Sequence, residues 1–96
     1  MAFSDEVELQ VQRMEQKLDK VVDTGTDEEL FIASYLHGHF SLAISQALLA
    51  KQSRLQDLDV AMQESLAVAF SNQELELKDQ HKVSALWQQL LHDQSK

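Results

Sequence analysis

The segment LFIASYLHGHFSLAISQALLA, residues 30–50, contains no Asp, Glu, Lys or Arg, although the sequence on both sides of it is rich in charge. A helix over this segment has apolar side chains on most of its sides, and such a helix belongs between other helices that cover it. The sequence therefore predicts an all-α fold in which a helix over about residues 27–51 is the central element.

The rest of the composition agrees with a small helical protein. The chain has 96 residues, of which 44% are hydrophobic and 25% charged, with two glycines and no proline. Sandwiches and barrels need many turns, whereas this composition offers few residues that favour turns. We expect a single helical domain over residues 1–96, folded as a compact, mostly antiparallel four-helix bundle with a frayed tail at 93–96.

The first predicted helix covers about residues 4–22. Ser4 can cap its N-terminus, and Gly25 is suited to a left-handed cap after its C-terminus. The apolar residues repeat at spacings of four and three, which is typical of a helix with one narrow buried face. They are Val7, Val11, Met14, Leu18 and Val21.

The central helix is expected to begin with a capping box formed by Thr26 and Glu29. Beside its apolar faces it has a stripe of small residues that includes Gly38. A glycine inside a helix costs about 1 kcal/mol relative to alanine, so we expect the close approach of a neighbouring helix to offset that cost. The residues of the small stripe are Ser34, Ser41, Ser45 and Gly38, and those of the two apolar faces are Ala33, Leu36, Phe40, Ile44 and Ala47, and Phe31, Tyr35, Gly38, Leu42 and Leu49.

Two further helices complete the predicted bundle. The third covers about residues 54–71 and is expected to be capped by Ser53 with Gln56. One long helix through the junction at 49–55 is the alternative, because neither glycine nor proline interrupts that stretch. The fourth helix covers about residues 77–92. Their apolar residues are Leu55, Leu58, Met62, Leu66 and Phe70, and Val83, Leu86, Trp87, Leu90 and Leu91.

Charge limits the choice of partners. The net charge is −8, with 16 Asp and Glu against 8 Lys and Arg. Nucleic acids and anionic membrane surfaces are bound through Lys and Arg, so neither is expected to be a partner. The segment 30–50 is long enough to span a membrane, but two histidines, a glycine and three serines within it argue against that. Because the N-terminal sequence also lacks the basic and apolar regions of a signal peptide, we expect a cytoplasmic protein.

The sequence indicates no metal site, cofactor or catalytic group. The absence of cysteine excludes disulfides and thiolate chemistry. His37 and His39 are two residues apart, so on a helix they point about 200° away from each other and cannot share a metal ion. The acidic run at 27–29 is expected at the start of a helix.

Five residues are candidates for contact with a ligand or a protein partner, and their residue types do not distinguish between the two. His39 is expected to form a hydrogen bond across a helix interface. Tyr35 and Trp87 are aromatic residues with a polar group, which suits both interface anchors and the edge of a core. The candidates are Tyr35, Gly38, His39, Leu42 and Trp87.

Several short motifs resemble the YfcL-like family of small bacterial proteins. They are DEELF at 27–31, YL-x-GH at 35–39, LAI at 42–44, EL at 74–75, KDQ at 78–80 and Trp87. The resemblance spans most of the chain and implies a helical bacterial protein. It implies no activity.

Two hypotheses on function follow from the sequence. The first is a non-catalytic module for protein–protein interaction or regulation, which includes a two-fold homodimer that covers apolar residues of the central helix. The alternative is an accessory protein that binds a small molecule or metal near Gly38 and His39, with Tyr35 and His81 close to the pocket. An enzyme is less favoured than either.

Overall fold

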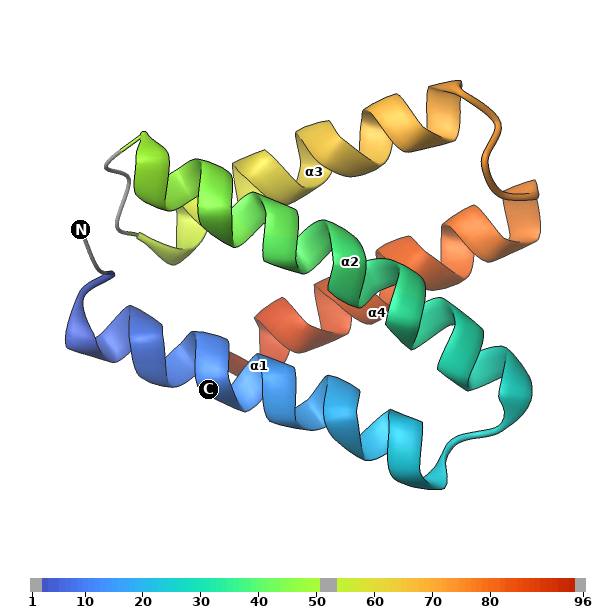
Figure 1. Ribbon diagram of the computed structural model, residues 1–96, viewed down its shortest axis with the longest axis horizontal. Coiled ribbons are helices and arrows are strands. Elements are labelled where there is room, and N and C mark those ends of the chain that lie inside the picture. Colours follow the sequence, from blue (N-terminus) through green and yellow to red (C-terminus); the bar gives the residue numbers. More distant parts are fainter. Residues whose placement is uncertain (1–2, 51–53, 95–96) are drawn as a thin grey trace.

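The described part of the chain folds into four helices that alternate in direction. The computed structural model describes residues 3–50 and 54–94, and its helices are α1 (Asp5–Thr24), α2 (Asp27–Leu49), α3 (Leu55–Ser71) and α4 (Leu77–Gln94). Consecutive helices run in nearly opposite directions, and α2 passes across the middle of the molecule (Figure 1). No strand occurs in the described residues. The prediction of an all-α, mostly antiparallel four-helix bundle is confirmed.

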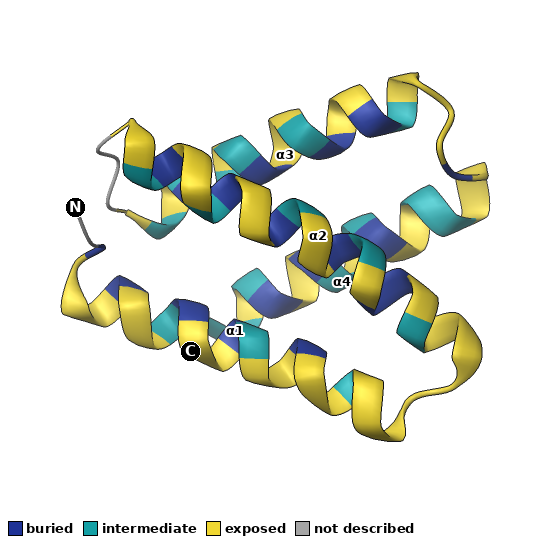
Figure 2. Ribbon diagram, viewed as in Figure 1, coloured by how far each residue is buried: buried dark blue, intermediate teal, exposed yellow. Residues whose placement is uncertain are grey.

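The central position of α2 is also confirmed, because α2 packs against each of the other three helices. The buried faces of all four helices point toward one another (Figure 2). They form one apolar core, and no polar side chain is buried among the described residues. The core residues are Phe3, Val7, Val11, Met14, Leu18, Ile32, Ala33, Leu36, Phe40, Ala43, Ala47, Leu58, Met62, Leu66, Leu75, Val83, Trp87 and Leu90.

The two ends of α1 differ in how well the sequence predicted them. Ser4 is the N-cap as expected, since its Oγ accepts a hydrogen bond of 3.3 Å from the backbone N–H of Val7. The predicted left-handed cap at Gly25 is wrong, because Gly25 is extended, with φ −80° and ψ 164°. Glycine is required there for space: a Cβ would lie 2.6 Å from the carbonyl oxygen of Val21.

The predicted capping box at the start of α2 is confirmed. The backbone N–H of Glu29 donates to Oγ1 of Thr26 at 3.2 Å, and the backbone N–H of Thr26 donates to Oε1 of Glu29 at 3.0 Å. Two backbone N–H groups that lack partners within the helix are thereby satisfied.

The alternative of one long helix through 49–55 is wrong. α2 ends at Leu49, α3 begins at Leu55, and the two helices pack side by side (Figure 1). The expected cap at Ser53 and the expected end of the second helix near Lys51 lie outside the described residues. At the start of α3, the backbone N–H of Arg54 donates to Oδ2 of Asp57 at 3.3 Å.

Among the helices of residues 3–50 and 54–94, none packs against one side of α2. Phe31, Leu42 and Leu49 on the second predicted apolar face are exposed, and so is the stripe of small residues. A Cβ on Gly38 would meet nothing within 4 Å, so the expected close helix at Gly38 is wrong. Three neighbours cover only part of the circumference of α2, and the remaining side faces solvent. Within the described residues, none of the helices has the length and apolar character needed to cross a membrane.

The last helix is longer than predicted. α4 continues through Gln94, two residues past the expected end. Asp93, expected to lie in a frayed tail, accepts a hydrogen bond of 3.0 Å from Nε2 of Gln89 and forms an ion pair with Lys17 of α1. The ion pair with Lys17 connects the end of α4 to α1.

Candidate functional site

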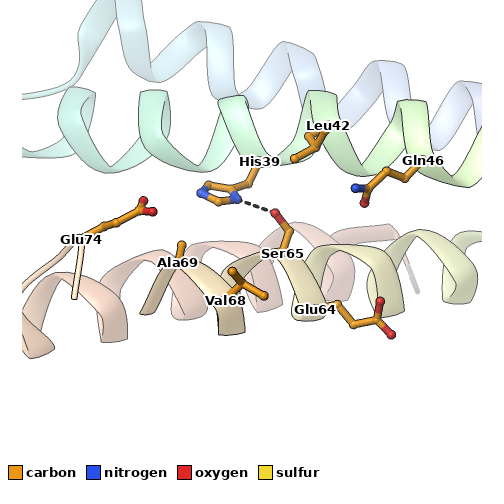
Figure 3. A pocket seen from close by; sticks show the side chains of 8 residues that line it. All are labelled: His39, Leu42, Gln46, Glu64, Ser65, Val68, Ala69 and Glu74. Atoms are coloured by element: carbon orange, nitrogen blue, oxygen red, sulfur yellow. Dashed lines mark hydrogen bonds between the residues drawn. The ribbon is translucent and has the colours of Figure 1, made fainter. Parts of the chain in front are cut away.

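A groove of about 390 Å³ lies between α2 and α3 (Figure 3). Three of its lining residues come from α2 and four from α3, and one comes from the loop after α3. We call this surface the α2–α3 groove. Its residues are His39, Leu42, Gln46, Glu64, Ser65, Val68, Ala69 and Glu74.

A hydrogen bond joins the two walls of the groove. Nδ1 of His39 on α2 lies 2.6 Å from Oγ of Ser65 on α3, and Figure 3 shows the two side chains pointing toward each other. This bond confirms the prediction that His39 connects two helices. The partners are 26 residues apart in the sequence, so the bond links α2 to α3 at the groove.

Glu74 lies toward one end of the groove (Figure 3). Gln73 has a positive φ of 58°, and the chain turns there so that the backbone N–H of Glu74 donates to the carbonyl of Ala69 at 3.4 Å. Oε1 of Glu74 then accepts a hydrogen bond of 2.9 Å from the hydroxyl of Tyr35. Burial raises the pKa of Tyr35 to about 12, with the hydrogen bond to Glu74 and the charge of Glu74 adding to the effect.

The apolar part of the groove faces solvent. Leu42 on α2 is 48% exposed and Val68 on α3 is 62% exposed. Beyond the groove, the apolar flank of α2 continues through an aromatic row: the ring centroids of His39 and Tyr35 are 4.9 Å apart, and those of Tyr35 and Phe31 are 6.5 Å apart. Phe31 is 50% exposed. The site is thus an apolar strip with polar groups along its edges.

The structure separates the sequence-derived candidates into two groups. Tyr35, His39 and Leu42 lie along one flank of α2, and Gly38 is exposed on the same helix. Trp87 is fully buried, with its ring centroid 5.6 Å from that of Phe40 and its Nε1 donating to Asp59 at 2.8 Å. Its side chain therefore lies in the core, below the surface that a partner could reach.

Other polar residues are placed as follows. His37 is exposed and borders a separate hollow between α1 and α2, and His81 is exposed and does not line the α2–α3 groove. Within residues 3–50 and 54–94, no group of three His, Cys, Asp or Glu side chains is arranged to hold a metal ion.

Sequence reasoning missed Ser65, Val68 and Glu74. Their role depends on the angle at which α3 packs on α2 and on the turn at Gln73, and neither is encoded by a local motif. The sequence offered one indication of this site: Val68 is an apolar residue on the exposed side of α3.

Comparisons with known proteins identify the family of this chain. The family model described as YfcL protein matches residues 8–92. An Escherichia coli (strain K12) protein named "Uncharacterized protein YfcL" is 33% identical over 78 residues, which cover 81% of this chain and 85% of that protein. No solved structure matches. The motifs quoted above were therefore a correct guide, and the chain belongs to the YfcL family.

Proposed function

We propose that this chain is a non-catalytic protein-interaction module that binds a protein partner along the α2–α3 groove. The observation that carries the proposal is the pair of exposed apolar side chains, Leu42 and Val68, on facing walls of a groove with a polar rim. An apolar patch rimmed by polar groups is typical of protein interaction sites.

The groove alone is small for a stable complex. Fully burying an aliphatic side chain stabilises by about 1.5–3 kcal/mol, so covering the exposed halves of Leu42 and Val68 contributes about 2–3 kcal/mol. Stable interfaces bury about 800 Å² on each partner. A partner must therefore extend beyond the groove, and the neighbouring aromatic row of Tyr35 and Phe31 offers the adjacent surface. The expected complex is reversible, which suits a regulatory role.

The partner can be another protein or a second copy of this chain. A two-fold homodimer would cover Leu42, Val68 and Phe31 with the same residues of the other copy. Light scattering at high concentration separates these cases, because a chain that binds only other proteins stays near its monomer mass of 10.9 kDa.

A pull-down with surface variants tests the proposal. Tagged wild-type protein and the double variant Leu42→Glu/Val68→Glu are incubated with a cytoplasmic extract, and captured proteins are quantified by mass spectrometry. The matched control is Leu9→Glu/Leu77→Glu, because Leu9 and Leu77 are 48% and 66% exposed and lie on α1 and α4. Specific capture should be lost in the groove variant and kept in the control. Equal capture by both variants would refute the proposal.

A small-molecule or metal-binding accessory protein is the second candidate. The position of His39 inside the α2–α3 groove favours it, because a volume of about 390 Å³ is within the range of small-ligand sites. Thermal melts with a panel of divalent metals and metabolites test it. A ligand that raises the melting temperature of the wild type and leaves His39→Ala unchanged would support this candidate, and no shift with any ligand would remove it.

A further inference from the structure

The Lys and Arg residues of the described helices are unevenly distributed. α2 and α3 contain no Lys or Arg, and both contain acidic residues. Every Lys and Arg within a described helix belongs to α1 or α4. These cations are Arg13, Lys17, Lys20, Lys78 and Lys82, and the acidic residues of α2 and α3 are Asp27, Glu28, Glu29, Asp57, Asp59 and Glu64.

The α2–α3 groove also lacks Lys and Arg among its lining residues. Its two charged lining residues are both acidic, and Figure 3 shows Glu74 toward one end and Glu64 toward the other, with Leu42 and Val68 between them. The hydrogen-bond donor to Glu74 is the hydroxyl of Tyr35, a neutral group that leaves the negative charge in place. No ion pair involves Glu64 or Glu74 within the described part of the chain.

We infer that the partner in the groove is a basic amphipathic segment of another protein. This inference rests on the proposed function and names the chemistry of the partner. Apolar side chains of the segment would cover Leu42 and Val68, while Lys or Arg residues before and after them would meet Glu74 and Glu64. Complementary charge at the rim sets specificity and speeds association, and apolar contact in the centre provides affinity.

The dimensions of the groove favour a helical segment. Its α2 wall extends from His39 to Gln46, a rise of seven residue steps and about 10 Å along the helix axis. That length matches about two turns of a helix laid between α2 and α3, which is the usual way in which an amphipathic helix occupies a groove. Such a helix presents two apolar side chains to the groove at i and i+4, with basic residues one turn to either side.

The same charges argue against a second copy as the occupant. A two-fold axis through the groove would place Glu64 and Glu74 against the cation-free α2 and α3 of the other copy. Like charges brought together across an interface oppose binding. A partner with the opposite charge has no such penalty.

Two synthetic peptides of about 18 residues test the inference, a length that allows an amphipathic helix to form on binding. Both present Leu at i and i+4, one with Lys at the flanking positions and the other with Glu. Fluorescence anisotropy with labelled peptides should give at least about tenfold tighter binding of the Lys peptide, equivalent to about 1.4 kcal/mol. Leu42→Ser/Val68→Ser, which removes the two apolar side chains without adding charge, should abolish binding of the Lys peptide.

Charge-neutral variants separate the groove from the general acidity of the protein. Glu64→Gln/Glu74→Gln removes both rim charges and keeps an oxygen acceptor for Tyr35, whereas the control Glu6→Gln/Glu8→Gln removes two exposed charges from α1. The groove variant should weaken the Lys peptide by at least about tenfold and the control by less than about twofold. Equal weakening by both variants would overturn the inference, because it would mean that only net charge matters.

The remaining outcomes distinguish this inference from the proposed function. Capture from extract that depends on Leu42 and Val68, combined with equal affinity for the two peptides, would overturn the basic partner and leave the interaction module intact. A dimer in light scattering that Leu42→Glu dissociates would overturn it in favour of a second copy. Capture that is indifferent to Leu42 and Val68 would overturn both.

Discussion

The indole Nε1 of Trp87 donates a hydrogen bond of 2.8 Å to Oδ1 of Asp59 and so joins α4 to α3. Trp87 is fully buried, and its ring packs against Phe40 of α2. One residue thus connects three helices, through apolar contact with one and a polar contact with another. A buried indole N–H needs an acceptor, and Asp59, half-buried at the edge of the core, supplies it.

Removal of that acceptor should destabilise the protein. Asp59→Ala leaves the buried N–H of Trp87 without a partner, for which we expect a loss of about 1–3 kcal/mol in the free energy of unfolding. Asp59→Asn retains a carbonyl oxygen at the same place and should lose less. Urea unfolding followed by circular dichroism measures both. In a Trp87→Phe background, Asp59→Ala should have a smaller effect, and an unchanged effect would mean that the bond to Trp87 is not the cause.

The titration of Tyr35 provides a probe of the groove. It is the single tyrosine of the chain, so its absorbance at high pH reports one group. Burial and the carboxylate of Glu74 raise its pKa to about 12 in the folded protein, against an ordinary value of 10.0. Spectrophotometric titration should find the raised value in the native protein and the ordinary value in urea. Glu74→Gln should lower the native pKa only in part, since burial is the larger cause.

The raised pKa of Tyr35 should make the free energy of unfolding depend on pH in the alkaline range. Below pH 10 the tyrosine is protonated in both states, and its contribution to stability is complete. Between about pH 10 and 12 the unfolded chain loses the proton while the folded chain keeps it, so the free energy of unfolding falls as pH rises. Tyr35→Phe should lack this part of the decline. A Phe variant with the same high-pH profile as the wild type would contradict the assignment.

The sequence predicted the helices well because their signals are local. The seam from Val7 to Val21 and the caps at Ser4 and Thr26 depend on residues three or four positions apart, and such spacings are set by the helix itself. The prediction at Gly38 failed for the opposite reason. Whether a small residue faces a neighbour or solvent depends on how many helices surround α2, which no local pattern states.

The site was predictable only in part. His39 stood out because it interrupts an apolar segment, and its hydrogen bond to another helix was expected. Its partner Ser65 and the second contact, from Tyr35 to Glu74, join residues 26 and 39 positions apart. Such pairings depend on packing angles and on the turn at Gln73, which has a left-handed conformation in a residue that does not favour it.

The capping box of α2 should make stability depend on acidic pH. The backbone hydrogen bond from Thr26, with a side-chain bond to the same residue, lowers the pKa of Glu29 below 4.5 in the folded protein. The contribution of the Glu29 carboxylate to the free energy of unfolding is therefore complete above pH 4.5. It is lost as the pH falls through the lowered pKa of Glu29 in the folded protein. Glu29→Gln should reduce this acid sensitivity in urea unfolding at pH 3–5. Glu15→Gln, on α1, is the control and should retain the wild-type profile, and equal profiles for all three proteins would contradict the role of the box.

The two glycines should respond in opposite ways to substitution by alanine. A Cβ on Gly38 meets nothing within 4 Å and the site is inside a helix, so Gly38→Ala should stabilise the protein by about 0.5–1 kcal/mol. A Cβ on Gly25 would lie 2.6 Å from the backbone oxygen of Val21, which cannot rotate away, so Gly25→Ala should destabilise by about 1–3 kcal/mol. Thermal and urea unfolding of both variants measure the difference. If Gly38→Ala is destabilised while light scattering still finds a monomer, another part of this chain must lie against α2 at Gly38. That result would contradict the open space found there.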